Sequence, residues 1–364
     1  MRKLRIVGLF LAAALLFVPA QAGAARPHAD KVRQTAKPIW TLAMDGSRVA
    51  YASGGKIDVW NTATGSRSVV RGTYGNAKPG VNGTAAELAI AGKRVAWLKD
   101  RQFGNTEEGE WLYTAPIGGR AHLADHVYRH GVDDRSLTTG GWIEGLAGAG
   151  KTIAVSTWKS NGTVATNQAL SLVTGTGLRA IAGGPGAIVS GAVDSGHIAV
   201  LSSSPWASTN SVLVYSCNSS APVGEVDLGL PDPETTGTEI SLSGSLLVVL
   251  TTALHEPSGP TTVTLQVYDW STGQLLNTWP VGIHSNGGAV SFAVHGQLAA
   301  VEGPGSLHLV DLTSGKDVVI GPSSHTGSPA AMNARGLVYA VNAHYNGPGK
   351  LVFVPTAKLL AAVS

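Results

Sequence analysis

Histidine side chains recur at a regular spacing in one segment of this chain. His122, His126 and His130 stand four residues apart, a spacing that on a helix would place three imidazoles on one face and attract a metal ion. The segment, however, ends a predicted strand and enters a loop rich in glycine and threonine, which breaks that geometry. We therefore expect solvated loop histidines here and no metal site.

Glutamates and further histidines form a second candidate site. Three glutamates enter predicted innermost strands, and two histidines lie in equivalent connections, so a circular repeat would bring them to the mouth of one channel. These residues are Glu87, Glu144, Glu239, His284 and His325, joined by His126 or His130. Carboxylates and imidazoles that converge on a concavity can act as acid, base or cation ligand. This supports one interpretation, an enzyme of the polysaccharide-lyase or hydrolase type.

Aromatic side chains in the long connections support a different interpretation. They combine flat apolar faces with neighbouring amide groups, a mixture that suits sugars or peptides. The residues are Trp158, Trp206, His344 and Tyr345. The competing explanation is that these rings only cover the edges of strands. We assign no catalytic residue and no cofactor, because no motif supplies a nucleophile with its base, a metal tetrad or a cofactor loop.

A repeated strand triplet indicates how these residues are positioned. The triplets are centred on Ala50, Ala96, Ala154, Ala199, Val248, Ala300 and Ala340, at intervals of 40 to 58 residues. This is the size of a four-stranded propeller blade. The repeat predicts an all-β protein, a single seven-bladed β-propeller of four-stranded antiparallel blades. We expect its last outer strands at Lys350–Val354 and Leu359–Val363.

The innermost strands follow a second pattern. Eight residues before the centre of each triplet stands a large apolar residue in six of the seven units, and Gly191 replaces it in the fourth. The hairpins on one face of the predicted ring are short. The connections on the other face are long, and they include residues 100–110 and 122–142. Long connections on a rigid scaffold are the default place for recognition, so we expect function on this long-loop face.

The N-terminus has the pattern of a cleavable signal peptide of bacterial type. Arg2, Lys3 and Arg5 precede an apolar run of thirteen residues and small residues typical of a cleavage site. Thirteen apolar residues are too few to span a bilayer, which needs about twenty. We expect a signal peptide at 1–24, a polar lead-in at 25–38 and the propeller at 39–364. The lead-in is either disordered or pairs with the last blade.

Charge and cysteine content narrow the possible partners. Three of the 26 basic residues and none of the 23 acidic residues lie in the signal peptide. The mature chain therefore has equal numbers of basic and acidic residues and carries no net charge. The chain also lacks a basic cluster, so we expect no nucleic-acid partner. A single cysteine, Cys217, excludes an intrachain disulfide. We expect a monomer, secreted or periplasmic, without stable membrane insertion.

Short motifs add a family resemblance. Asp45-Gly46 before Val49-Ala50-Tyr51, followed by Ile57-Asp58-Val59-Trp60, resembles the WD40-like repeat of TolB-type secreted propellers. The segment Asp269-Trp270-Ser271-Thr272-Gly273 with Trp279 is more weakly similar to quinoprotein-type repeats. Both resemblances imply a propeller and nothing catalytic. We therefore favour an exported noncatalytic scaffold that binds a protein, peptide or carbohydrate through the long-loop face, with the enzyme above as the alternative.

Overall fold

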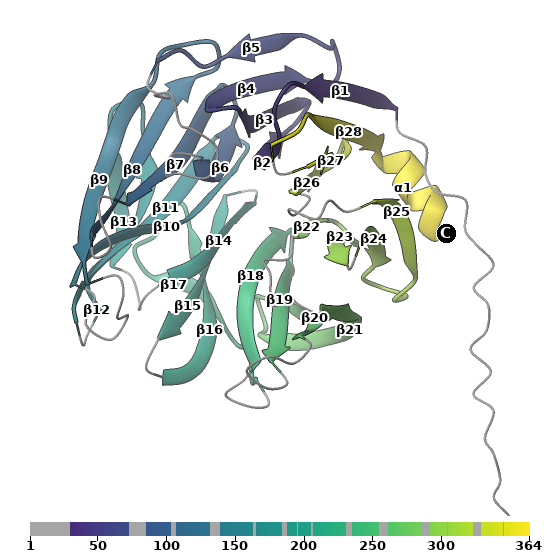
Figure 1. Ribbon diagram of the computed structural model, residues 1–364. Helices are drawn as coiled ribbons and strands as arrows, with labels where there is room; N and C mark the ends of the chain where they lie inside the picture. The colour runs from purple at the N-terminus through teal and green to yellow at the C-terminus, as the bar shows by residue number, and fades with distance from the viewer. Residues whose placement is uncertain are drawn as a thin grey trace, which may run out of the picture.

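The structure is a computed structural model. It describes residues 30–72, 85–102, 107–131, 139–162, 165–183, 188–194, 196–204, 207–230, 235–254, 261–284, 292–303, 305–322, 329–344 and 346–364. Strands arranged in a ring account for nearly all of this part of the chain (Figure 1). In the described residues no helix is long and apolar enough to cross a membrane.

The described strands form five separate four-stranded sheets and one eight-stranded sheet. The first blade contains β2 (Ile39–Asp45), β3 (Arg48–Ser53), β4 (Lys56–Asn61) and β5 (Arg67–Val69). A second separate blade contains β14 (Ile188–Asp194), β15 (His197–Ser204), β16 (Ala207–Ser216) and β17 (Pro222–Asp227). A third contains β18 (Thr235–Ser243), β19 (Leu246–Leu254), β20 (Thr261–Asp269) and β21 (Gln274–His284). A fourth contains β22 (Phe292–His295), β23 (Leu298–Gly303), β24 (Ser306–Asp311) and β25 (Asp317–Pro322). The fifth contains β26 (Ala330–Asn333), β27 (Gly336–Asn342), β28 (Gly349–Pro355) and the N-terminal β1 (Lys31–Thr35).

The eight-stranded sheet corrects the predicted blade number. It contains β6 (Ala85–Ala91), β7 (Arg94–Gln102), β8 (Glu107–Pro116), β9 (His122–His130), β10 (Thr139–Ala149), β11 (Thr152–Asn161), β12 (Ala165–Val173) and β13 (Leu178–Gly183). The all-β propeller is confirmed, but the prediction of seven separate four-stranded blades is wrong. The structure has five, and the strands expected to form the second and third blades belong to one continuous sheet.

Two residue pairs between β9 and β10 make this sheet continuous. His130 pairs with Thr139, and Arg129 pairs with Gly140. Gly140 has φ +127°, and a Cβ placed there would lie 2.3 Å from the carbonyl oxygen of Tyr128. Only glycine therefore permits this close approach. The two halves of the sheet also pack face to face, because apolar residues of β6–β8 and β10–β12 share one hydrophobic cluster.

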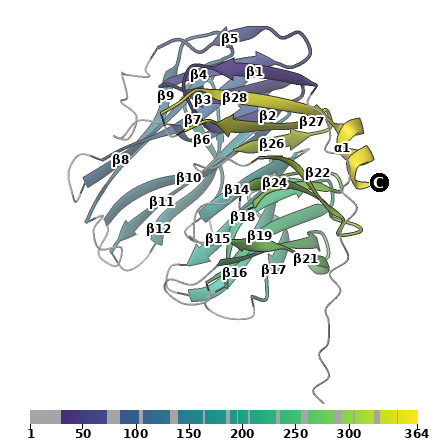
Figure 2. The same ribbon diagram turned by 45° about the vertical axis from the view of Figure 1, so that its right-hand side comes forward.

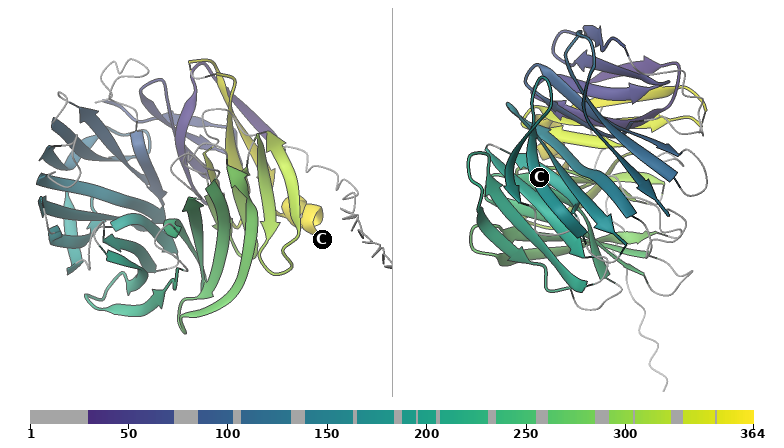
Figure 3. Two further views of the ribbon diagram at one scale, coloured as in Figure 1. Left: turned by 60° about the horizontal axis from the view of Figure 1, so that its bottom comes forward. Right: turned by 90° about the vertical axis from the view of Figure 1, so that its left-hand side faces the viewer.

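The innermost strands surround a cavity of about 520 Å³ on the propeller axis. Its described lining comes from β2, β10, β14, β18, β22 and β26 with their hairpins, and none of it comes from β6. Figures 2 and 3 show the ring of strands from other directions. Gly191 of β14 is explained by its neighbour, since a Cβ there would lie 2.3 Å from the Gly145 carbonyl oxygen of β10. The glycine that interrupts the apolar pattern thus lets two inner strands approach closely.

Short polar side chains tie neighbouring hairpins together on the short-hairpin face of the ring, where Asp45 and Asp194 also line the cavity. Each carries an oxygen that accepts a hydrogen bond from the backbone N–H of a hairpin glycine in another unit. The pairs are Asp45 with Gly92 (2.7 Å) and Gly150 (3.0 Å), Asp194 with Gly244 (2.6 Å), and Ser243 with Gly296 (2.7 Å). These repeated contacts fasten the short hairpins of this face to one another.

The N-terminal strand closes the ring. β1 pairs antiparallel with β28, so the polar lead-in supplies the outer strand of the last blade. Between the last and first blades, the Asn342 side chain accepts a hydrogen bond from the Ile39 N–H and donates one to the Ile39 carbonyl, each at 2.8 Å. The expected outer strand at Leu359–Val363 is instead part of helix α1 (Thr356–Val363). Leu359, Ala362 and Val363 are buried there, at a helical spacing.

Candidate functional site

Charged and aromatic side chains meet where the two halves of the eight-stranded sheet join. We call Glu108, Glu110, Arg129, Trp142, Glu144 and Trp158 the seam cluster. β8 and β9 supply the first three residues, while β10 and β11 supply the others. The cluster lies toward the end of these strands that leads into the long connections. The sheet folds over between β9 and β10, so its two halves face each other. The side chains of the seam cluster meet for this reason.

Arg129 is the centre of the charged part of the cluster. Its Nη2 lies 2.7 Å from Glu108 Oε2 and its Nη1 lies 2.5 Å from Glu110 Oε1. The exposed fraction of the Arg129 side chain is 11%, against 7% for Glu110. Charge-assisted hydrogen bonds of this kind are strong and directional. Arg129 therefore fixes β9 against β8 and balances two carboxylates that are largely removed from water.

Glu110 connects the charged residues to the second half of the sheet. Its Oε2 accepts a hydrogen bond of 2.7 Å from the backbone N–H of Ile143 in β10. Burial raises the pKa of Glu110, while Arg129 and the Ile143 N–H act in the opposite direction. This carboxylate thus bridges β8, β9 and β10 with a single side chain.

The aromatic part of the cluster is a stacked tryptophan pair. Trp142 and Trp158 are directly opposite on β10 and β11, with ring centroids 4.1 Å apart and planes 3° from parallel. The Trp158 Nε1 donates a 3.0 Å hydrogen bond to Glu144 Oε2, and the Arg129 Cζ lies 5.5 Å from the Trp142 ring. Both tryptophans are partly exposed. The pair is a flat apolar surface whose orientation is held by two charged neighbours.

Two further carboxyl groups lie near the cluster and have raised pKa values. Burial raises the pKa of Glu87 to about 8, and the Leu146 N–H, which donates to Glu87 Oε2 at 2.5 Å, opposes this rise. Burial, with Glu110 and Glu108, raises the pKa of Asp100 to about 7. Carboxyl groups that titrate near neutral pH are candidates for acid or base chemistry. Such groups are also found where a carboxyl group is simply buried inside a fold.

The predicted glutamates do not all meet. Glu144 contributes to the pKa of Glu87, so these two are close, and burial also raises the pKa of Glu144. Glu239 belongs to β18, on another blade, and burial alone raises its pKa to about 7. The described structure thus brings Glu87 and Glu144 together and leaves Glu239 apart.

The segment with regularly spaced histidines is a strand along its whole length. β9 contains His122, His126 and His130, where the sequence led us to expect a loop. His126 and His130 are exposed, and His130 Nδ1 lies 3.3 Å from Glu107 Oε1. His126 contacts the Tyr128 ring edge-on, with centroids 5.5 Å apart. Within the described ranges, no three His, Cys, Asp or Glu residues are placed to hold a metal ion.

The remaining predicted site residues are only partly covered. His344 is exposed in the connection between β27 and β28. His284 ends β21, where it pairs with Thr261, but its side chain lies outside the described part. Trp206, His325 and Tyr345 lie outside the described residues.

Sequence reasoning missed Arg129, Glu110 and Trp142. Residues 107–110 and 122–130 were assigned to long connections, whereas the structure has them in paired strands β8 and β9. A signal was present in the alternation of Glu108 and Glu110 on one face of a strand, with one arginine available in the next segment. The alternation alone does not identify the partner strand.

No protein-family model matches the sequence, and no curated protein is significantly similar to it. Solved structures are similar in fold. Hydrazine synthase from Kuenenia stuttgartiensis aligns with 93% of this chain and 99% of its own, at 10% identity and a TM-score of 0.55. YCF48 bound to the D1 peptide aligns over 93% and 99%, at 10% identity and a TM-score of 0.50.

The Pan2 WD40 domain of Neurospora crassa aligns with 88% of this chain and 90% of its own, at 14% identity and a TM-score of 0.47. At such low identities a likeness concerns the fold alone. A signature of TolB-type secreted propellers is not among these findings. By its fold the chain is therefore a β-propeller.

Proposed function

We propose that the chain is an exported, noncatalytic scaffold that binds a peptide segment of another protein on its long-loop face, at the seam cluster. The observation that carries this proposal is the stacked pair of Trp142 and Trp158. Its partly exposed rings lie at a centroid distance of 4.1 Å, and Glu144 and Arg129 hold them in place. A rigid aromatic surface loses little conformational entropy when it takes up a ligand.

The bonding of the carboxyl groups favours binding over chemistry. Glu87 and Glu110 accept hydrogen bonds from backbone N–H groups, and Glu144 accepts one from an indole. Each of these bonds connects strands or fixes a neighbouring side chain. A catalytic acid or base instead needs its oxygen available to a substrate proton. We therefore assign Glu110 and Glu144 to holding the aromatic surface, and Glu87 to joining β6 to β10.

A peptide is favoured over a sugar by the kind of aromatic residue present. A second aromatic pair, Tyr128 of β9 and Trp111 of β8, has its rings in edge-on contact at 5.7 Å, with Tyr128 49% exposed. Strand alternation places this pair on the opposite face of the sheet from Arg129. Tyrosine and tryptophan are enriched at protein interfaces. YCF48, a structure of similar fold, is bound to a peptide, which supports the proposal by analogy.

Replacing Trp158 with alanine is expected to weaken peptide binding by about 2 kcal/mol or more, because buried aromatic contacts dominate interfaces. Trp142→Ala is expected to do the same. The measurement is a peptide-library selection on the mature chain, followed by titration of selected peptides against the variants. The matched control is Trp270→Ala, since Trp270 is also partly exposed and bonded through Nε1, to the Gly244 carbonyl at 2.9 Å, but lies at the opposite face. Equal weakening by Trp270→Ala and Trp158→Ala would contradict the assignment.

The alternative, a polysaccharide-lyase or hydrolase-type enzyme, is favoured by the raised pKa values of Glu87 and Glu239. It would be supported if exported polysaccharides were cleaved by the wild type and turnover disappeared in Glu87→Gln or Glu239→Gln while binding survived. Under our proposal these variants bind the selected peptides as the wild type does. The two functions are therefore separated by one set of variants.

Export is the second part of the proposal. We expect the mature chain to begin near Arg26 and to appear in the periplasm or culture medium of a bacterial host, free of lipid. The measurement is fractionation of cells that express the full chain, followed by N-terminal sequencing of the product. Uncleaved protein in the membrane fraction would refute export in this form.

A further inference from the structure

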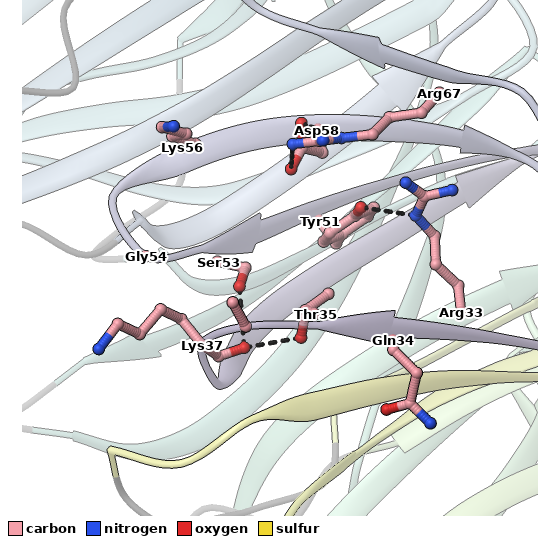
Figure 4. Close-up of a pocket in the computed structure, with 11 residues that line it drawn as sticks. Arg33, Gln34, Thr35, Lys37, Tyr51, Ser53, Gly54, Lys56, Asp58 and Arg67 are labelled. Atoms are coloured by element: carbon pink, nitrogen blue, oxygen red, sulfur yellow. Dashed lines mark hydrogen bonds and ion pairs between the residues drawn. The ribbon is translucent and has the colours of Figure 1, made fainter.

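A polar pocket of about 250 Å³ lies between the ring-closing strand and the first blade (Figure 4). Arg33 of β1 and Lys37, which follows β1, line one side. Tyr51, Lys56 and Arg67 line the side formed by β3, β4 and β5. None of the lining residues belongs to the seam cluster, so the pocket is independent of the proposed peptide site.

Positive charge predominates in the pocket. Its lining contains four Lys or Arg residues and one carboxylate, Asp58. Asp58 is only 4% exposed and is bound by Arg67 through two hydrogen bonds, Nε to Oδ1 at 3.0 Å and Nη2 to Oδ2 at 2.8 Å. Arg33, Lys37 and Lys56 have no carboxylate partner among the described residues. The lining of the pocket therefore has three more basic side chains than acidic ones.

The Tyr51 hydroxyl adds a buried donor. Tyr51 is 1% exposed, and its Oη accepts a 3.0 Å hydrogen bond from Arg33 Nε. Burial raises the pKa of Tyr51, so the hydroxyl keeps its proton at neutral pH. Among the described residues no acceptor takes up that proton. In Figure 4 the Arg33 guanidinium lies beside this hydroxyl, at the same end of the pocket as Arg67, and the Lys37 and Lys56 ammonium groups lie toward the other end. A ligand with several acceptor oxygens would accept from the hydroxyl and from the guanidinium groups at this end.

The wall of the pocket is fixed before any ligand binds. The hydroxyl groups of Thr35 and Ser53 both donate to the Lys37 carbonyl, at 2.7 and 2.9 Å. Gly54 has φ +58°, and a Cβ at this residue would lie 3.0 Å from the Lys37 Cγ. These contacts hold the turn after β1 against β3. Donors that are positioned in advance cost little to organise when a ligand arrives.

We propose that this pocket binds a tetrahedral oxyanion group, a phosphate or a sulfate, carried by a small polar ligand. At one end of the pocket Arg33 of β1, the Tyr51 hydroxyl of β3 and Arg67 of β5 supply donors from three strands, which suits an anion whose oxygens point in four directions. A planar carboxylate would reach fewer of them. The volume of about 250 Å³ exceeds the ~30 Å³ of one water molecule several times, so part of an organic ligand fits as well.

Binding at this place would also strengthen ring closure. Arg33 belongs to the strand that completes the last blade, whereas Arg67 belongs to the first blade. An anion in contact with both guanidinium groups would join the two ends of the ring. We therefore expect backbone amides of β1 to exchange more slowly with solvent when phosphate is bound.

The test is a calorimetric titration of the mature chain, residues 25–364, with inorganic phosphate and with sulfate at constant ionic strength. We expect saturable binding at one site, weakened about tenfold or more by Arg33→Gln, since this variant removes a charge-assisted bond. Lys56→Gln should weaken binding less, because the Lys56 ammonium group lies toward the other end of the pocket. Tyr51→Phe removes only the hydroxyl and should weaken binding to a smaller extent. The matched controls are Arg179→Gln and Lys159→Gln, which remove exposed cations elsewhere.

The stronger ligand of the two identifies the group as phosphate or sulfate. Equal affinity in the wild type and in Arg33→Gln would overturn the proposal, and Arg33 is only half-buried and has no carboxylate partner among the described residues, so this variant should fold. Acetate that binds as tightly as phosphate would also overturn it. Trp158→Ala should leave the phosphate titration unchanged, which separates this result from the outcome of the peptide experiments.

Discussion

Replacing Arg129 with methionine is expected to lower the free energy of unfolding by about 3–5 kcal/mol at neutral pH, the usual effect of leaving a buried charge without its partner. The Arg129 guanidinium lies between Glu108 and Glu110, and only 11% of its side chain is exposed. Methionine keeps most of the apolar part of the arginine side chain, so the lost free energy of unfolding measures the effect of removing the charge. Chemical denaturation followed by circular dichroism measures it.

The carboxylates provide a rescue experiment. Adding Glu108→Gln and Glu110→Gln to Arg129→Met should recover most of the lost stability, because no uncompensated charge then remains and the glutamine still accepts from the Ile143 N–H. Arg179→Met is the control, since Arg179 is exposed. A triple variant no more stable than Arg129→Met would contradict this account of the cluster.

The pH dependence has a definite sign. Burial raises the pKa of Glu110 in the folded protein, and Arg129 opposes the rise. A raised pKa favours the protonated form on folding, so the stability from this group is lost as pH rises through the folded-state pKa. Removing Arg129 raises this pKa further. The difference in the free energy of unfolding between Arg129→Met and the wild type should therefore be small near pH 4 and grow toward pH 7.

Replacing Gly191 with alanine is expected to destabilise the protein by about 2–4 kcal/mol, although the apolar pattern of the inner strands favours a large residue there. The added Cβ would lie 2.3 Å from the Gly145 carbonyl oxygen, so β10 and β14 must move apart. The atoms that the new Cβ would meet are backbone atoms of Gly145, so no flexible side chain can move aside to relieve the contact. Thermal and urea unfolding of the variant measure the effect.

Gly183 supplies the matched control for this prediction. It is also a strand glycine, in β13, and a Cβ at this residue would meet no atom within 4 Å. Gly183→Ala should change the free energy of unfolding by less than about 0.5 kcal/mol. If Gly191→Ala were as mild as Gly183→Ala, the close approach of β10 and β14 would not be a constraint on the fold.

Local patterns predicted the strands well because each depends on neighbours in the sequence. All seven repeated triplets lie in the second strand of their unit, from Val49-Ala50-Tyr51 in β3 to Tyr339-Ala340-Val341 in β27. The number of separate blades depends instead on whether His130 and Arg129 pair with Thr139 and Gly140, which no period in the sequence encodes. The apolar run at Leu359–Val363 suits either a strand or a helix.

The candidate site was predictable only in part, for the same reason. Glu87, Glu144 and Trp158 were recognised as functional candidates, and in the structure Glu144 accepts a hydrogen bond from Trp158. Arg129 and Trp142 join them through pairing between β8, β9, β10 and β11. Their segment resembled a loop because glycine and threonine surround it. Which residues meet where a sheet folds over depends on the register of its strands. That register is set by pairing between segments that are distant in the sequence.

Hydrogen exchange of the mature chain, with and without a selected peptide, tests the central claim most directly. We expect slower exchange in β10 and β11 around Trp142 and Trp158 and at the end of β9, and we expect the same change to be absent in Trp158→Ala. Protection confined to the hairpins at Asp45–Arg48 and Asp194–His197, on the opposite face, would contradict a binding site at the seam cluster.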